Sequence, residues 1–184
     1  MEALEALHNR ISAARLTKPA PDDEALLNIY KSALRAADHG LLTPWRFLVI
    51  KGASLEKLGN LFVEASLSDD ADMSPEKQEN IRRKPLRAPL IVVTISSSEH
   101  HPKIPVFEQE LSAAAATQNM LMAAYSQGVG AMWRTGSMAY HPLVKKGLGL
   151  AIHEKIIGFL YLGTIAGPTR ALTETQVELF FKEW

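Results

Sequence analysis

Two apolar runs decide the fold of this chain: Ala88-Pro-Leu-Ile-Val-Val-Thr-Ile95 and Lys155-Ile-Ile-Gly-Phe-Leu-Tyr-Leu-Gly163. Each run has the length of a β-strand, and neither alternates apolar with polar residues. Strands of this kind are covered on both faces, so helices should pack on either side of a sheet. We therefore predict one three-layer domain with a mixed sheet, spanning residues 1–184.

Periodicity and turn residues place the remaining elements around these two strands. Further strands are predicted at 44–50 and 129–135, and helices at 22–37, 53–66, 75–83, 106–127 and 142–147. Residues 68–72 are predicted to form a polar loop. The tail at 166–184 ends in an apolar run from Val177 to Trp184, which should pack on the domain or on a partner subunit.

The segment from Leu111 to Trp133 contains no charged residue and is long enough to cross a bilayer. It also contains six polar side chains, among them Gln118 and Asn119, which are too many for a lone helix facing lipid. A helix whose faces are all apolar or small is buried in protein. We therefore predict the central helix of the domain, or an oligomer interface, and no membrane span.

Composition excludes several classes of function. The 184 residues carry 20 basic and 20 acidic side chains and no cysteine. Because neither half of the chain is basic, nucleic-acid binding is not expected. Without cysteine there is no disulfide, thiolate metal site or cysteine nucleophile, so redox chemistry requires a bound organic cofactor. The N-terminus carries two acids before any base, whereas a secretory signal begins with basic residues. We therefore expect the protein in the cytoplasm.

Individual motifs are ambiguous when each is taken alone. Gly128-Val-Gly130 follows a helix and precedes a strand, the reverse of a dinucleotide site, so a glycine helix stop explains it better. The loop at His100-His101 has no third spaced histidine, and no metal site is expected. Arg35 and His39 are four residues apart, which would place both cations on one helix face or simply supply favourable charge at its C-terminus.

Two further charged groups have structural explanations. Glu108 and Glu110 are expected in the first turn of the long helix, where acids suit the helix dipole. The bases Arg82-Arg83-Lys84 and Arg87 suit a phosphate group, but a solvated helix end beside the acids of residues 69–72 is the preferred interpretation.

As an ordered set, however, the motifs of residues 1–165 resemble the FMN-dependent nitroreductase family, specifically its short bacterial members. The resemblance rests on Arg10-Ile-Ser12, Arg35–His39 with Thr43-Pro-Trp-Arg-Phe47, Arg87-Ala-Pro89, Glu108-Gln-Glu110, Gly128–Gly136 and Ile157–Gly163. It implies an α+β, three-layer αβα sandwich with a mixed, mainly antiparallel sheet, and a homodimer with FMN at the subunit interface.

The resemblance also assigns residues. In one subunit FMN would contact Arg10, Ile11, Ser12, Trp133, Arg134 and Thr135, and the neighbouring subunit would add Arg35 and His39. The nicotinamide nucleotide would meet Ala123, Ala124, Tyr125, Ser126, Gln127 and Gly128. No side chain is assigned as a catalytic acid or base. Ile11 stands where the family often has a base, so FMN affinity is expected to be lower unless Arg134 compensates.

The activity implied is an oxidoreductase that takes hydride from NADH or NADPH and reduces nitroaromatic, quinone or similar acceptors through the flavin. A protein that stores or delivers FMN with little turnover is a second hypothesis. A dimeric interaction domain without flavin is a third, because the buried helix and the apolar tail would fit it.

Overall fold

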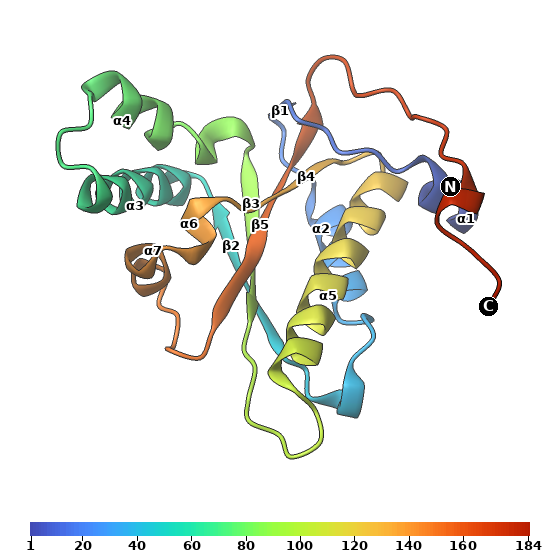
Figure 1. The fold of residues 1–184 in the computed structure, drawn as a ribbon. Coiled ribbons are helices and arrows are strands. Elements are labelled where there is room, and N and C mark those ends of the chain that lie inside the picture. The colour runs from blue at the N-terminus through green and yellow to red at the C-terminus, as the bar shows by residue number, and fades with distance from the viewer.

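A five-stranded sheet lies between two layers of helices (Figure 1). The structure is a computed structural model that describes residues 1–184. The strands are β1 (Leu16–Thr17), β2 (Trp45–Lys51), β3 (Leu90–Ser96), β4 (Gly130–Arg134) and β5 (Lys155–Ile165). They are ordered β1-β5-β3-β2, with β4 also paired to β5, and each pair is antiparallel. The expected αβα sandwich is confirmed, and its sheet, predicted to be mixed and mainly antiparallel, contains antiparallel pairs only.

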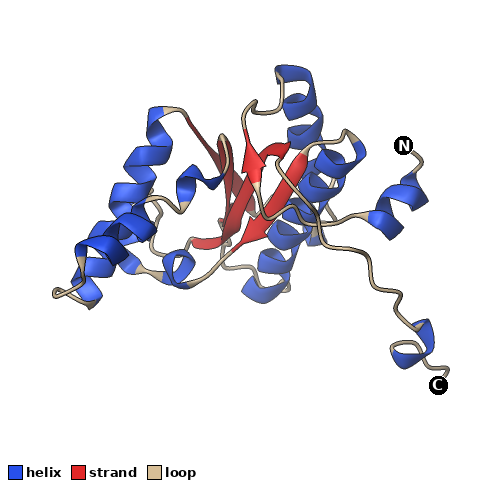
Figure 2. Ribbon diagram, turned by 90° about the horizontal axis from the view of Figure 1, so that it is seen from above, coloured by secondary structure: helices blue, strands red, loops and turns tan.

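The helices lie on both sides of the sheet (Figures 1 and 2). One layer holds α2 (Asp23–Ala33) and α5 (Val106–Ser126), and the other holds α3 (Ala53–Asp69), α4 (Pro75–Arg82), α6 (Ser137–Tyr140) and α7 (Pro142–Gly147). Helix α1 (Ala3–Asn9) lies beyond α5, and short 3₁₀ turns form at η1 (His39–Leu41), η2 (Pro85–Arg87) and η3 (Val177–Leu179). None of these helices is both long enough and apolar enough to span a membrane.

Strand β3 is buried along its whole length, which confirms that both of its faces are covered. Its side chains alternate between two cores, as the pleat of a strand requires. Leu90 and Val92 pack with α2 and α5, whereas Ile91, Val93 and Ile95 pack with α3. The central strand therefore joins the two helical layers.

Helix α5 is the predicted central helix, and its small residues let it lie close to the sheet. Ala113, Ala116 and Ala124 are fully buried, and Thr117 Oγ1 donates a 2.9 Å hydrogen bond to Thr94 Oγ1 on β3. The opposite face of α5 stays partly exposed, with Leu111 half in solvent. Gln118 and Ser126 are exposed on the same helix, so the outer surface of α5 mixes apolar and polar side chains.

Two helix ends and the packing of the tail differ from the sequence prediction. Helix α2 ends at Ala33 rather than at residue 37, because the following N–H groups bond locally, Arg35 N to Ser32 O at 3.1 Å. Helix α3 continues to Asp69, so the first residues of the predicted loop at 68–72 are helical. Residues 167–184 are exposed and extend away from the sandwich, so the tail does not pack on its own domain (Figure 2).

A buried ion pair ties the edge of the sheet to the loop before β5. Arg46 on β2 donates from Nε and Nη2 to the two carboxylate oxygens of Glu154, each at 2.6 Å. Ala151 N–H adds a 2.8 Å bond to the same carboxylate. The Glu154 side chain is only 5% exposed. Hydrogen bonding from Arg46 therefore holds its pKa at about 2, below the ordinary value of 4.5.

Arg46→Ala should lower the free energy of unfolding at pH 7 by about 3 kcal/mol, at the lower end of the range for a buried pair because Arg46 is partly exposed. Glu154 has a depressed folded-state pKa, so its stabilisation is present above the unfolded value and is lost as the pH falls through the range from 4.5 to about 2. Urea unfolding should therefore show a smaller difference between wild type and variant at pH 3 than at pH 7.

Lys77→Ala is the control, because it removes an exposed pair with Asp70 and should cost less than about 1 kcal/mol. An Arg46→Ala loss that is the same at both pH values would contradict the role given to Glu154.

Candidate functional site

A cavity of about 410 Å³ opens where β4 ends and the chain turns into α6. Its apolar floor is formed by Phe62, Met132, Met138, Phe159 and Tyr161. Arg134, Thr135 and Gly136 form one rim, and Gly136 has a φ of 86°, which permits the sharp turn into α6. Lys84 and Arg87, at the turn η2, form the opposite rim.

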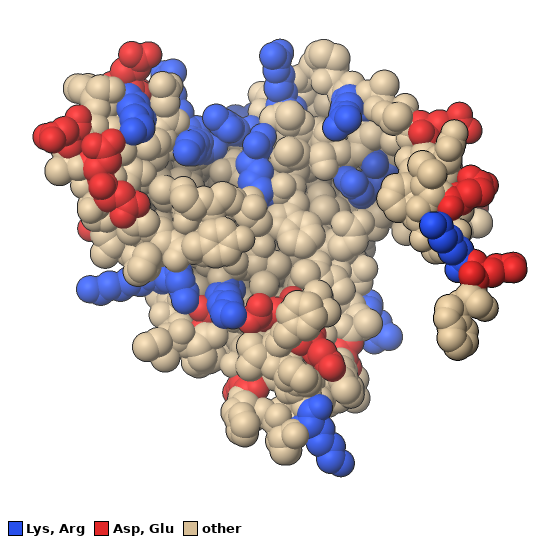
Figure 3. Space-filling model, in the orientation of Figure 1, with Lys and Arg blue, Asp and Glu red and all other residues tan.

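The three bases of this cavity leave positive charge without a counter-ion. Arg134, Lys84 and Arg87 take part in none of the seven ion pairs of the structure. Figure 3 shows basic side chains gathered over η2, between the acidic end of α4 and the central strands. A cavity with an aromatic floor and unpaired cations at its rim suits a planar ligand that carries negative charge.

Arg134 has an unusual environment. Its guanidinium lies 5.5 Å from the centre of the Tyr161 ring, and its Nε is buried without a hydrogen-bond partner. Burial raises the pKa of the Tyr161 hydroxyl, and the positive charges of Arg134 and Arg87 partly oppose that rise. Both arginines are therefore close to the floor of the cavity. A buried donor without a partner is costly unless a ligand or water completes it.

The segment Arg10-Ile11-Ser12 does not line this cavity, but the two residues that follow it contact β4. Arg10 Nη1 donates to Ser12 Oγ at 3.3 Å, so the charge and the hydroxyl predicted to act together are adjacent. Two further bonds attach the following residues to β4: Ala13 N to Ala131 O at 2.9 Å, and Arg134 Nη2 to Ala14 O at 3.4 Å. All three predicted residues are half-buried rather than free in solvent.

Trp133 also borders the cavity, but its indole ring does not fill it. The ring packs with the core on the α2 and α5 side, and Nε1 donates to Ile157 O at 3.3 Å. The ring lies directly over Gly158, where a Cβ atom would overlap it. Trp133 therefore faces the other helical layer, while Arg134 and Thr135 form the cavity rim.

Arg35 and His39 do not share a helix face, so that part of the prediction is wrong. Because α2 ends at Ala33, both residues lie in the following loop. Arg35 lines a second cavity of about 570 Å³ with α1 and Asn119 of α5. His39 instead contacts Glu108, about three helical turns away along α5. Neither residue lines the cavity at β4 in the same chain.

The segment from Ala123 to Gly128 forms the last turn of α5 and the residues just after it. Ala123 and Ser126 line the same cavity as Arg35, whereas Ala124 is buried against the sheet. Gln127 is held by its own chain, where it accepts a 3.0 Å bond from Asn28 and donates to Ala123 O. Gly128 has a φ of 73°, which fits the predicted glycine stop.

Lys84 and Arg87 line the cavity, although a solvated helix end is the preferred interpretation of these bases from the sequence. That interpretation is correct for Arg82 and Arg83, which pair with Glu79, but not for Lys84 and Arg87. Pro85 is the signal: it ends the helix and starts η2, which turns the chain toward the cavity. The structure contains no group of three or more potential metal ligands.

The fold class is that of solved nitroreductase-like structures. A nitroreductase-like family protein from Bacillus cereus superposes with a TM-score of 0.85 and 20% sequence identity, over 100% of this chain and 96% of that one. A nitroreductase with bound FMN from Bacteroides fragilis gives a TM-score of 0.76 and 20% identity, with both chains fully covered. These likenesses define the architecture.

Sequence similarity defines the family. Residues 8–164 match the model of the nitroreductase family. The chain is 42% identical over 164 residues to the Escherichia coli K12 protein named "Putative NAD(P)H nitroreductase YdjA", covering 89% of this chain and 88% of that one. A Haemophilus influenzae protein of the same general name is 33% identical over 178 residues, covering 96% and 95%. The chain therefore belongs to the nitroreductase family.

Gly158→Ala tests the packing beside the cavity. The new methyl group would overlap the Trp133 indole and the neighbouring strand backbone, so the ring must move. Overpacking of this kind costs about 1–3 kcal/mol. Thermal unfolding should therefore show a clear drop in Tm, and an unchanged Tm would mean that the indole does not occupy this position.

Proposed function

We propose that this protein is an FMN-dependent oxidoreductase that uses NADH or NADPH to reduce nitroaromatic, quinone or similar acceptors. The observation that carries the proposal is the cavity at the end of β4, where an aromatic floor meets three unpaired cations. Family membership and the FMN complex of the B. fragilis neighbour support it. We further propose the cytoplasm as its location, because reduced nicotinamide nucleotides are available there.

The residues of this chain fit FMN in charge and in shape. Arg10 and Ser12 offer a guanidinium and a hydroxyl for the phosphate, as a terminal phosphate group requires. Lys84, Arg87 and the buried Nε of Arg134 offer donors to polar atoms of the ring system. Ile11 adds no charge here, so Arg10 is the one base of this segment assigned to the phosphate.

A homodimer completes the proposed site. Arg35 and His39 face away from the cavity of their own chain, so only a second copy would bring them to the flavin. The partly exposed face of α5 and the apolar tail, with Phe180 and Phe181 more than 70% exposed, offer the surface that such a dimer would bury. The tail then packs on the partner subunit.

Bound FMN would supply the hydride and electron chemistry, which no side chain of this protein can perform alone. The chain's own contribution is to orient the ring through the cavity rim, neutralise its negative charge with Arg134, Lys84 and Arg87, and exclude bulk water with the aromatic floor. Ala123 and Ser126 border the second cavity, which also contains Arg35 and which we assign to the nicotinamide nucleotide. No residue is given the role of acid or base.

Storage or delivery of FMN is the second candidate, favoured by the uncharged Ile11 in the phosphate-binding segment. Steady-state oxidation of NADH and of NADPH with nitrofurazone or a quinone separates the two functions. Turnover with either nucleotide supports the oxidoreductase. A protein that is yellow with bound FMN but shows no turnover with any pair of nucleotide and acceptor supports storage.

Arg10→Ala combined with Ser12→Ala should yield colourless protein, because it removes both groups assigned to the phosphate. The flavin absorbance of the purified protein, compared with wild type at equal concentration, checks this. Arg15→Ala is the matched control: its side chain is exposed nearby, and the variant should stay yellow. A double variant that keeps full flavin absorbance would disprove the phosphate assignment.

Lys84→Met should raise the Kd for FMN about tenfold, which corresponds to about 1.4 kcal/mol, because it removes one cation from the cavity rim and keeps the apolar stem. Arg83→Met is the control, since that neighbouring base pairs with Glu79 outside the cavity. Quenching of flavin fluorescence on titration measures both. If the two variants bind FMN with the same Kd, Lys84 does not contact the flavin.

A further inference from the structure

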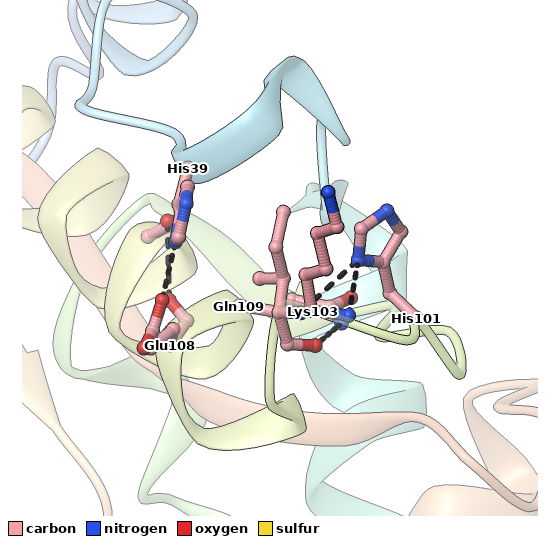
Figure 4. Close-up of polar contacts among 7 residues, drawn as sticks. His39, His101, Lys103, Glu108 and Gln109 are labelled. Atoms are coloured by element: carbon pink, nitrogen blue, oxygen red, sulfur yellow. Dashed lines mark hydrogen bonds and ion pairs between the residues drawn. The ribbon is translucent and has the colours of Figure 1, made fainter.

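The side chain of His39 is exposed, yet its orientation is fixed. Its imidazole is 62% exposed, and Nδ1 lies 2.5 Å from Oε2 of Glu108 on the first turn of α5 (Figure 4). The second ring nitrogen, Nε2, points away from Glu108 and has no hydrogen-bond partner within the chain. One side of the ring is therefore held by the protein, and the other is available to a different molecule.

The loop that carries His39 has a costly conformation. Gly40, Leu41 and Thr43 have φ values of 75°, 56° and 47°, a region that side chains other than glycine rarely adopt. Asp38 holds the loop by accepting a 2.7 Å bond from Thr43 N–H. Such backbone conformations persist only where the surroundings fix them, and they cluster at functional sites.

The structure beneath this loop fixes Glu108 relative to His39. Gln109, which is buried, exchanges bonds of 2.9 and 2.8 Å with the backbone of Glu99. His101 Nδ1 accepts the Ile104 N–H at 3.1 Å (Figure 4). Ile104 in turn lies against Gly40, where a Cβ atom would overlap its side chain. The start of α5 and the His39 loop therefore form one packed unit.

A carboxylate next to Nδ1 determines which nitrogen of an imidazole carries the proton. With Nδ1–H donated to Glu108, the orientation of the ring is fixed and Nε2 is the atom presented outward. We propose that Glu108 is a positioning residue, which fixes His39 so that Nε2 meets a polar atom of the FMN bound by a second copy of the chain. This inference rests on the proposed function.

Glu108→Ala should raise the Kd for FMN about tenfold, because the freed ring must be ordered when the flavin binds. Glu108→Gln keeps an oxygen that can accept Nδ1–H, so it should recover most of the affinity. Glu110→Ala is the matched control: this acid, two residues away on the same helix, pairs with Lys155 at 2.7 Å. Its Kd should stay within about twofold of wild type.

A double-mutant cycle separates positioning from a general effect on folding. If Glu108 acts through His39, adding Glu108→Ala to His39→Ala should cause no further loss of FMN affinity. The inference would be overturned if Glu108→Ala lowered FMN affinity equally in the wild type and in the His39→Ala variant. It would also be overturned if the Glu108→Ala variant bound FMN like wild type. The Tm of each variant without flavin shows whether the fold is intact.

The failure of the proposed function has a different signature. In that case the wild-type protein itself would bind no FMN, and the inference would fall with it. A wild type that binds FMN normally beside an unaffected Glu108→Ala variant would overturn only the role given to Glu108.

Discussion

The antiparallel pairing of β3 with β5 fixes where the other elements of the domain can lie. The two strands are paired from Leu90 to Ser96 and from Lys155 to Leu162, and both send large apolar side chains to the two opposite faces. Neither face can be left in water, so helices must cover both. This requirement places α5 on one side and α3 on the other, and it leaves the end of β4 open where the two layers diverge.

The proposed site combines the cavity at the end of β4 with Arg35 and His39, which the fold places away from that cavity. The cavity at β4 collects positive charge from two separate segments, η2 and the end of β4, while Arg35 and His39 lie on the α5 side of the sheet. Under the proposed function, a single chain would hold two complementary halves of a site. A two-fold dimer would bring each half against the other, since symmetric interfaces apply the same contact twice.

Periodicity and strand-length apolar runs predicted the layers and most elements, because the buried faces of β3, β5 and α5 leave a clear pattern in the sequence. The pattern could not give the end of α2, which depends on local hydrogen bonds after Ser32. It also favoured a solvated helix end for Lys84 and Arg87, whose position depends on a turn at Pro85 rather than on a helix. The separation of Arg35 from His39 follows from the same early helix end.

Subunit complementation tests directly whether two chains share the flavin site. One copy would carry Arg10→Ala with Ser12→Ala, and the other Arg35→Ala with His39→Ala, each purified alone and after co-expression. A shared site predicts weak flavin binding for each variant alone. It also predicts recovery to about one quarter of wild-type flavin content in a random mixture, since half of the dimers are heterodimers and each heterodimer holds one intact site. Heterodimers that form but recover no flavin would contradict a site shared between two chains.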